Sequence, residues 1–173
     1  MIITFLQRLL WMLALVAMQM LVFNHIHLLG YATPLMSIYL LLLFPLGTKR
    51  WTILLWGFVC GLLVDMVSLT LGVCTSAMTL AAFIQPPLLK AIEPQNAAED
   101  MQASFHTLGF WTYVRYAAVM ITVFMVTYFL VQAFTFFHLK DIALDFVGSW
   151  LLTLVLCLAL EATRSRKSSQ HAA

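Results

Sequence analysis

The sequence predicts an all-α integral membrane protein, built as a bundle of six transmembrane helices. Of its 173 residues, 63% are hydrophobic and only 9% are charged, whereas soluble domains carry about 25% charged residues. The apolar residues form runs close to the roughly 20 residues that one crossing needs. These runs lack the apolar–polar alternation of barrel strands, so helices must satisfy the backbone amides in hydrocarbon. We expect one membrane domain over residues 1–163 and a short basic cytoplasmic tail over residues 164–173.

The first expected span is long enough to cross the membrane, whereas the second is short. Residues 6–23 could imitate a secretory signal, but no small-x-small cleavage site precedes the polar NHIH, so we expect an uncleaved span. The second segment, 31–46, has about 16 residues, or about 24 Å of helix. Pro34 and Pro45 bracket it. Such a segment either thins the local bilayer or sits inside the bundle, screened by longer helices.

The third and fourth spans are expected over 51–67 and 73–89, with the SLTLG turn between them. Pro86 and Pro87 interrupt the end of the fourth span. A proline inside a helix removes a hydrogen bond and crowds the preceding turn. We therefore expect a kink there, with residues 88–92 lying along the cytoplasmic interface.

The last two spans, 113–134 and 142–160, bring the expected number to six, and the distribution of basic residues supports an even number. Cationic loops resist translocation. With the N-terminus inside, only Lys140 of the nine basic residues falls outside, and both termini are cytoplasmic. The basic residues on the cytoplasmic side are Arg8, Lys49, Arg50, Lys90, Arg115, Arg164, Arg166 and Lys167.

Asp65 is the one carboxylate between Trp51 and Ala91. An ionised carboxylate in hydrocarbon costs several kcal/mol unless it is neutralised, paired or drawn to the interface. It also falls in the last turn of the third span, where the helix dipole disfavours negative charge. Two interpretations remain open. Either the helix stops at Val64 and Asp65 joins Ser68 and Thr70 in capping a turn, or Asp65 serves a partner or ligand surface.

Two glycines on the third span share a helix face with each other. Gly57 and Gly61 stand four residues apart, and such a small-xxx-small face permits close approach of a second helix. The neighbour is either a helix of the same bundle or one of another subunit.

The side chains that commonly bind metals or form disulfides are scattered. Cys60, Cys74 and Cys157 show no CxxC spacing, so we expect three reduced, packed thiols. His25 and His27 offer two ligands, whereas zinc sites usually take three or four. We expect no metal and no cofactor.

A short motif resembles that of a known family. Gly61-Leu62-Leu63-Val64-Asp65, followed by Leu71-Gly72, is similar to the G-x-x-x-D-x6-LG signature of MreD, the bacterial rod shape-determining membrane protein, with five residues instead of six between Asp65 and Leu71. Three further features fit this family: Gln19 near the end of the first span, Leu29-Gly30 before Pro34, and the length and hydropathy of the chain. The polar loop over 93–109 is longer than is usual in the family.

The resemblance implies a small component of the lateral wall elongation machinery in the cytoplasmic (inner) membrane. Its partners would be MreC, a transpeptidase and glycosyltransferase pair, and, indirectly, the MreB filament. It also implies a fold similar to the substrate-binding subunits of energy-coupling factor transporters. Gly61, Asp65, Leu71 and Gly72 carry over as the family motif, and with Gly57 they form the candidate partner surface. Membrane lipid, but no nucleic acid, is expected to bind.

The sequence favours an adaptor over an enzyme, because it contains no Gly-rich phosphate loop, HExxH or GxSxG motif. The main hypothesis is therefore a non-enzymatic adaptor for MreC and the wall synthases. The rival is a solute-binding or lipid-binding membrane subunit of a transporter, because short Pro-flanked helices and an outer-facing acid could line a cavity.

Overall fold

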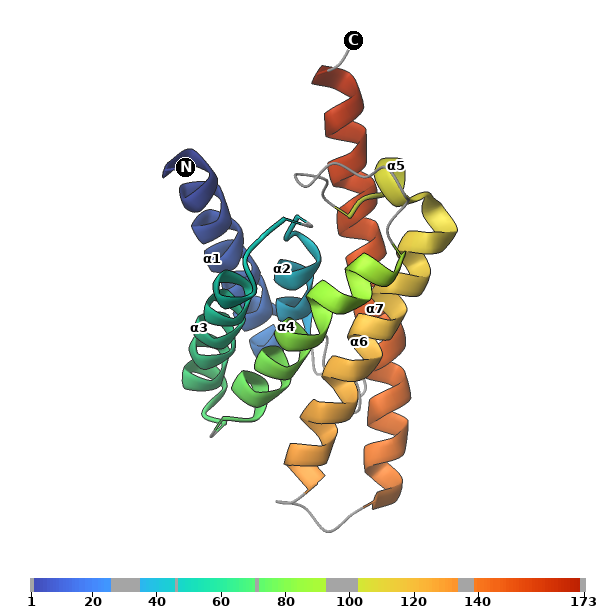
Figure 1. Cartoon of the computed structure of the whole chain (residues 1–173). Coiled ribbons are helices and arrows are strands. Elements are labelled where there is room, and N and C mark those ends of the chain that lie inside the picture. Colours follow the sequence, from blue (N-terminus) through green and yellow to red (C-terminus); the bar gives the residue numbers. More distant parts are fainter. Residues whose placement is uncertain are drawn as a thin grey trace.

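The computed structural model of the chain describes residues 2–25, 35–45, 47–70, 72–92, 103–133 and 139–171, and the regular secondary structure of these residues is entirely helical, without strands (Figure 1). The elements, in chain order, are α1 (Ile2–His25), the 3-10 helix η1 (Met36–Ile38), α2 (Tyr39–Leu42), α3 (Arg50–Ser68), α4 (Val73–Ile92), α5 (Phe105–Leu108), α6 (Phe110–Ala133) and α7 (Leu139–His171).

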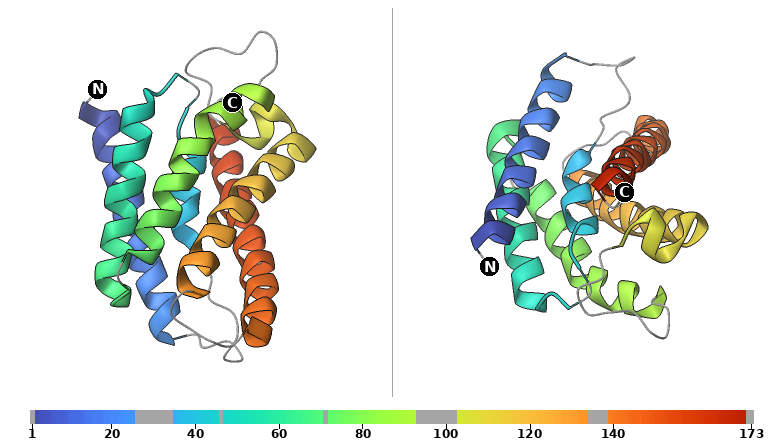
Figure 2. Two further views of the ribbon diagram at one scale, coloured as in Figure 1. Left: turned by 60° about the horizontal axis from the view of Figure 1, so that its bottom comes forward. Right: turned by 90° about the horizontal axis from the view of Figure 1, so that it is seen from above.

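The long helices form a curved row around the short central segment. α1 packs on α3, α3 on α4, α4 on α6, and α6 on α7. Viewed from above, α2 lies in the middle of this arrangement (Figure 2). The N- and C-termini lie toward the same end of the bundle (Figure 1). We call this the terminal end and the other the hairpin end, after the turn between α3 and α4.

The second expected span is a short buried helix rather than a long crossing. Only Met36–Leu42 are helical among the described residues of this segment. Seven residues of helix reach about 11 Å, far less than the roughly 30 Å of a bilayer core. Every side chain from Leu35 to Leu42 is buried. The alternative in which this segment sits inside the bundle is therefore the observed one for residues 35–45, and residues 31–34 and 46 of the expected span lie outside the described residues.

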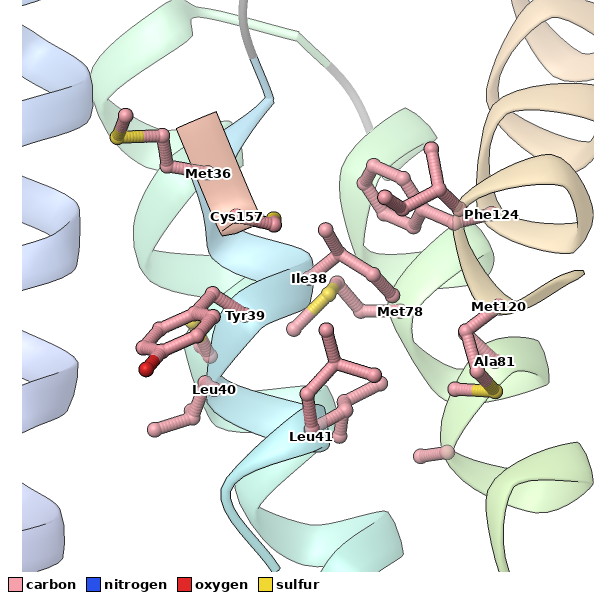
Figure 3. Packing of buried hydrophobic residues seen from close by; sticks show 14 of the residues in the cluster. Met36, Ile38, Tyr39, Leu40, Leu41, Met78, Ala81, Met120, Phe124 and Cys157 are labelled. Atoms are coloured by element: carbon pink, nitrogen blue, oxygen red, sulfur yellow. The ribbon is translucent and has the colours of Figure 1, made fainter. Parts of the chain in front are cut away.

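Apolar side chains fill the space between the central segment and the surrounding row. Figure 3 shows Ile38 directed toward Met78 of α4, with Met120 and Phe124 of α6 facing the same region. All four are completely buried. The core of the bundle therefore forms around η1 and α2.

Among the residues that the structure describes, three helices are long and apolar enough to cross a membrane: α3 over Arg50–Ser68, α6 over Phe110–Gln132 and α7 over Phe146–Arg164. A shorter apolar stretch, Leu9–Gln19, lies within α1. These helices indicate a membrane protein.

Two helices continue beyond the limits expected from the sequence. α4 continues through Pro86 and Pro87 to Ile92, and its last turns change direction (Figure 2). α7 continues through Arg164 to His171, so the expected tail over 164–173 begins as a continuation of the last helix and not as a separate segment.

Candidate functional site

Asp65 lies in the last turn of α3, but the helix does not stop before it. α3 ends three residues later at Ser68, and Leu69 closes it in the left-handed conformation, with φ 53°. The backbone amides of Leu69 and Thr70 both donate to the Asp65 carbonyl, the second at 3.1 Å. The helix therefore does not stop at Val64, as one of the two open interpretations had it, but Asp65 does take part in capping the turn, as that interpretation also had it.

The carboxylate of Asp65 caps the next helix. Its Oδ1 accepts hydrogen bonds from Thr70 Oγ1 at 2.7 Å and from the Cys74 amide at 2.9 Å. Its Oδ2 accepts from the Thr75 amide at 2.8 Å and from Thr75 Oγ1 at 2.6 Å. Cys74 and Thr75 are the second and third residues of α4, whose amides have no partner inside the helix. Asp65 thus supplies the N-cap contacts of α4 from the preceding helix.

This arrangement explains how a carboxylate is accommodated near the unfavourable end of α3. The N-terminus of α4 presents amide donors and the positive end of its dipole to the same carboxylate. Asp65 is only 6% exposed, and its two oxygens share four hydrogen bonds. Buried charge is tolerated when it is hydrogen-bonded in this way.

Gly57 and Gly61 face α4, within the bundle. A Cβ atom on Gly57 would lie 2.9 Å from the Ala82 Cβ, and one on Gly61 would lie 2.6 Å from the Thr75 Cα. Both distances are too short for real side chains, so the glycines allow α3 and α4 to approach closely. This glycine face is therefore occupied by α4 and is not open to another subunit.

Gly72 forms the turn that leads into α4. Its φ of +77° is a left-handed conformation that favours glycine. Its carbonyl accepts the Ser76 amide at 3.0 Å, the first hydrogen bond of α4. The other turn residue of the motif, Leu71, lies outside the described residues. Close approach by Gly61, capping by Asp65 and the turn at Gly72 together build the α3–α4 hairpin.

An open apolar groove of about 1020 Å³ lies along the outside of this hairpin. Its side chains include the exposed Phe58 and Phe83, at 46% and 63%, and the polar Asp65 and Thr75 lie at the hairpin end. We call it the hairpin groove. Its lining residues are Leu54, Phe58, Leu62, Asp65, Met66, Leu69, Thr70, Gly72, Thr75, Ser76, Thr79, Leu80 and Phe83.

A second polar region, inside the bundle, holds the start of the central segment. The Leu35 amide donates to Thr153 Oγ1 of α7 at 3.2 Å, and the Ser37 amide donates to Gln19 Oε1 of α1 at 3.1 Å. Amides at a helix start lack partners within the helix, and here they are buried. Side chains from two long helices therefore provide the hydrogen-bond acceptors for these backbone amides, which lipid chains could not provide.

Glu161 connects α7 to the same segment nearer the terminal end. It is 1% exposed. Its Oε2 accepts a hydrogen bond from the Tyr39 hydroxyl at 3.0 Å and lies 3.6 Å from Arg164 Nη1. The boundary expected at residue 163 would separate this ion pair. The helical domain therefore extends at least to Arg164.

Glu161 and Thr153 are interior residues that were not expected from the sequence. A signal was present, because Ser149, Thr153, Cys157 and Glu161 recur every four residues and share one helix face. All four are completely buried or nearly so. The stripe was hard to detect because Leu and Val residues occur on every face of this helix, so the four buried residues do not stand out from an apolar sequence.

The predictions about sulfur and metal ligands have different outcomes. Cys60, Cys74 and Cys157 are free, buried thiols, which confirms that prediction. Within the described ranges, no three His, Cys, Asp or Glu side chains gather as a metal site. The side chain of His25 and all of His27 lie outside the description, so the H-x-H pair is untested.

No family model, curated protein or solved structure matches the chain. The resemblance to MreD therefore depends on the motif residues, the length and the hydropathy pattern.

Proposed function

We propose that this chain is an MreD-type component of the bacterial wall elongation complex, a non-enzymatic adaptor in the cytoplasmic membrane that holds MreC and the wall synthases together. MreB would be reached indirectly. The motif resemblance through Gly61, Asp65 and Gly72 supports the proposal. The three residues also build one hairpin. This supports the proposal further, because residues that act together in one structural feature are less often matched to a motif by chance.

A six-crossing topology, and a fold like that of energy-coupling factor substrate-binding subunits, belong to the same proposal. In it, the segment around η1 and α2 makes the second crossing inside the bundle. Two observations favour an even number of crossings. Both termini lie toward one end (Figure 1), and eight of the nine basic residues would then be cytoplasmic.

The hairpin groove is the observation that carries the adaptor role. It is apolar, open and formed by two adjacent helices, and an α-helix with its side chains is about 10 Å across. Helix association in membranes depends on such close packing together with occasional polar contacts. Thr75 and Thr79 supply hydroxyls within the groove. A membrane helix of MreC is the occupant proposed here.

In this proposal Asp65 acts on the partner indirectly. Its oxygens are occupied by the α4 cap, so it shapes the wall of the groove instead of contacting the partner. Asp65→Ala would therefore impair partner binding by loosening the hairpin, together with a loss of stability.

Photo-crosslinking tests the groove directly. A photoreactive amino acid at Phe83, inside the groove, should cross-link to MreC in living cells. The matched control is Val155 of α7, which has a similar exposure but lies outside the groove. Equal cross-linking at both positions, or none at Phe83, would contradict the groove as the docking site.

Cell shape tests the biological role. Depletion of the protein should make rod-shaped cells round, because lateral wall synthesis would lose its adaptor. Cells that keep a normal diameter after depletion would refute the proposed function, whatever binds the groove.

The rival function, a solute-binding or lipid-binding transport subunit, is favoured by one observation. The bundle interior contains buried polar side chains, among them Gln85 and Glu161, which a solute could contact. A thermal stability that rises with a small metabolite, together with copurification of an ATPase module, would support this rival. A lipid that remains bound in native mass spectrometry would support its lipid-binding form.

A further inference from the structure

A group of buried polar atoms at the terminal end has no hydrogen-bond partner within the described part of the chain. They are both amide atoms of Gln85 on α4, the hydroxyls of Tyr113 and Tyr116 on α6, and Glu161 Oε1 on α7. All four side chains are at most 1% exposed. Neither lipid nor bulk solvent therefore reaches these atoms.

The four side chains neighbour one another. The rings of Tyr113 and Tyr116 are 6.4 Å apart. The Gln85 amide lies next to the Tyr116 hydroxyl but outside hydrogen-bond geometry, and Glu161 lies near Tyr113. The ring of Phe105, from the short helix α5, packs on Tyr113 at 4.9 Å. The unpartnered atoms thus belong to one polar region between α4, α6 and α7, with α5 beside it.

Leaving such atoms unpaired would be costly. A buried donor or acceptor without a partner costs about 1–3 kcal/mol, and five of them would consume much of the 5–15 kcal/mol by which a typical protein is stable. Folded proteins resolve this with buried water, which typically makes about three hydrogen bonds to polar groups that protein atoms cannot satisfy.

The chemistry of the group favours water over an ion. Gln85 Nε2 donates, Gln85 Oε1 and Glu161 Oε1 accept, and a tyrosine hydroxyl does both. The Glu161 charge is already opposed by Arg164 at 3.6 Å. A cation would meet the donating amide and the guanidinium, and an anion would meet the carboxylate. A neutral molecule that donates and accepts satisfies every member.

We propose that ordered water occupies a buried site bounded by Gln85, Tyr113, Tyr116 and Glu161. The water bridges α4, α6 and α7 at the terminal end, where apolar contacts alone would leave these polar groups unsatisfied. This hydrated site is independent of the adaptor proposal, because it lies within the bundle and away from the hairpin groove.

X-ray radiolytic footprinting of the purified protein tests the site, because hydroxyl radicals form from water and label the side chains next to it. Tyr113 and Tyr116 should be labelled several-fold faster than Tyr128, the control on the same helix. Tyr128 has the same ring and a higher exposure, 8% against 0%. A dry interior predicts the reverse order, and that result would overturn the proposal.

A variant gives a second reading of the same site. In Tyr116→Phe the water loses one of its ligands, so labelling of Tyr113 should fall several-fold while labelling of Tyr128 stays unchanged. Labelling of Tyr113 that remains at the wild-type rate in a folded variant would also overturn the site. A tightly bound metabolite in place of water would protect Tyr113 and Tyr116 of the wild type from labelling. The first measurement would then find them labelled no faster than Tyr128, and the water proposal would be refuted.

Discussion

Replacing Asp65 with alanine is the perturbation whose effect follows most directly from the structure. The change removes the acceptor of the Cys74 and Thr75 amides, which are enclosed at the start of α4. Loss of an N-cap costs about 0.5–2 kcal/mol, and each orphaned buried donor costs about 1–3 kcal/mol. The hydroxyls of Thr70 and Thr75 can turn to other acceptors, and removing a buried charge returns part of the loss. We expect a net decrease of about 3 kcal/mol in the free energy of unfolding.

Asp65→Asn provides an intermediate case. Its amide oxygen keeps one acceptor, but its NH2 group faces donors where the second carboxylate oxygen was. The expected decrease is about half that of alanine. The predicted order of stability is therefore wild type, asparagine, then alanine.

The assay is unfolding of the purified protein by a denaturing detergent in mixed micelles, followed by the fluorescence of its five tryptophans. Ser68→Ala is the matched control, because Ser68 lies in the same last turn of α3 with an exposed side chain. An Asp65→Ala variant within about 0.5 kcal/mol of the wild type, the range of surface substitutions, would refute the capping role. If that variant also lost its partner, Asp65 would belong to a contact surface instead.

Further substitutions test the hairpin and the central segment by the same assay. Gly61→Ala should cost about 1–3 kcal/mol, because its Cβ would overlap the α4 backbone. Gly72→Ala, at φ +77° with open space around it, should cost about 1 kcal/mol from backbone strain alone. Thr153→Val should cost about 1–3 kcal/mol by leaving a buried amide without its acceptor; the exposed Thr163→Val, whose hydroxyl bonds only its own helix, should change nothing measurable. Tyr39→Phe should destabilise by about 1–2 kcal/mol through loss of its bond to a buried carboxylate; an unchanged midpoint would refute that contact.

The parts of the fold that sequence reasoning found are those that depend on local pattern. The third helix was expected over 51–67 and runs over Arg50–Ser68, and the fourth was expected to begin at Val73, where it does begin. Hydropathy and turn residues mark such segments because each long run is apolar and each break is polar. Asp65 was recognisable as unusual for the same local reason.

The central segment could not be read in this way. An apolar run such as LMSIYLLLLF has the same composition whether it is surrounded by lipid or by protein. Its position inside the bundle depends on the residues that form hydrogen bonds with its backbone amides and with the Tyr39 hydroxyl. These residues are far away in the sequence. Thr153 is 118 residues from Leu35, and Glu161 is 122 residues from Tyr39. Without an observed pairing, the interior polar stripe of α7 could not be distinguished from scattered hydroxyls.

The sequence left open which helix the Gly57 and Gly61 face meets, also for a physical reason. A small-xxx-small face indicates close approach of a helix but does not say which helix approaches. Gly57 and Gly61 use that approach for α4, so the surface left for a partner lies on the other side of the hairpin. The exposed Phe58 and Phe83 mark that side.

The most direct test of the adaptor account is purification of the tagged protein from its own membrane under mild detergent, with mass spectrometry of what accompanies it. The account predicts MreC together with the elongation transpeptidase and glycosyltransferase, and loss of MreC when Phe58 and Phe83 are both replaced by alanine. Recovery of an ATPase module, with MreC absent, would contradict it.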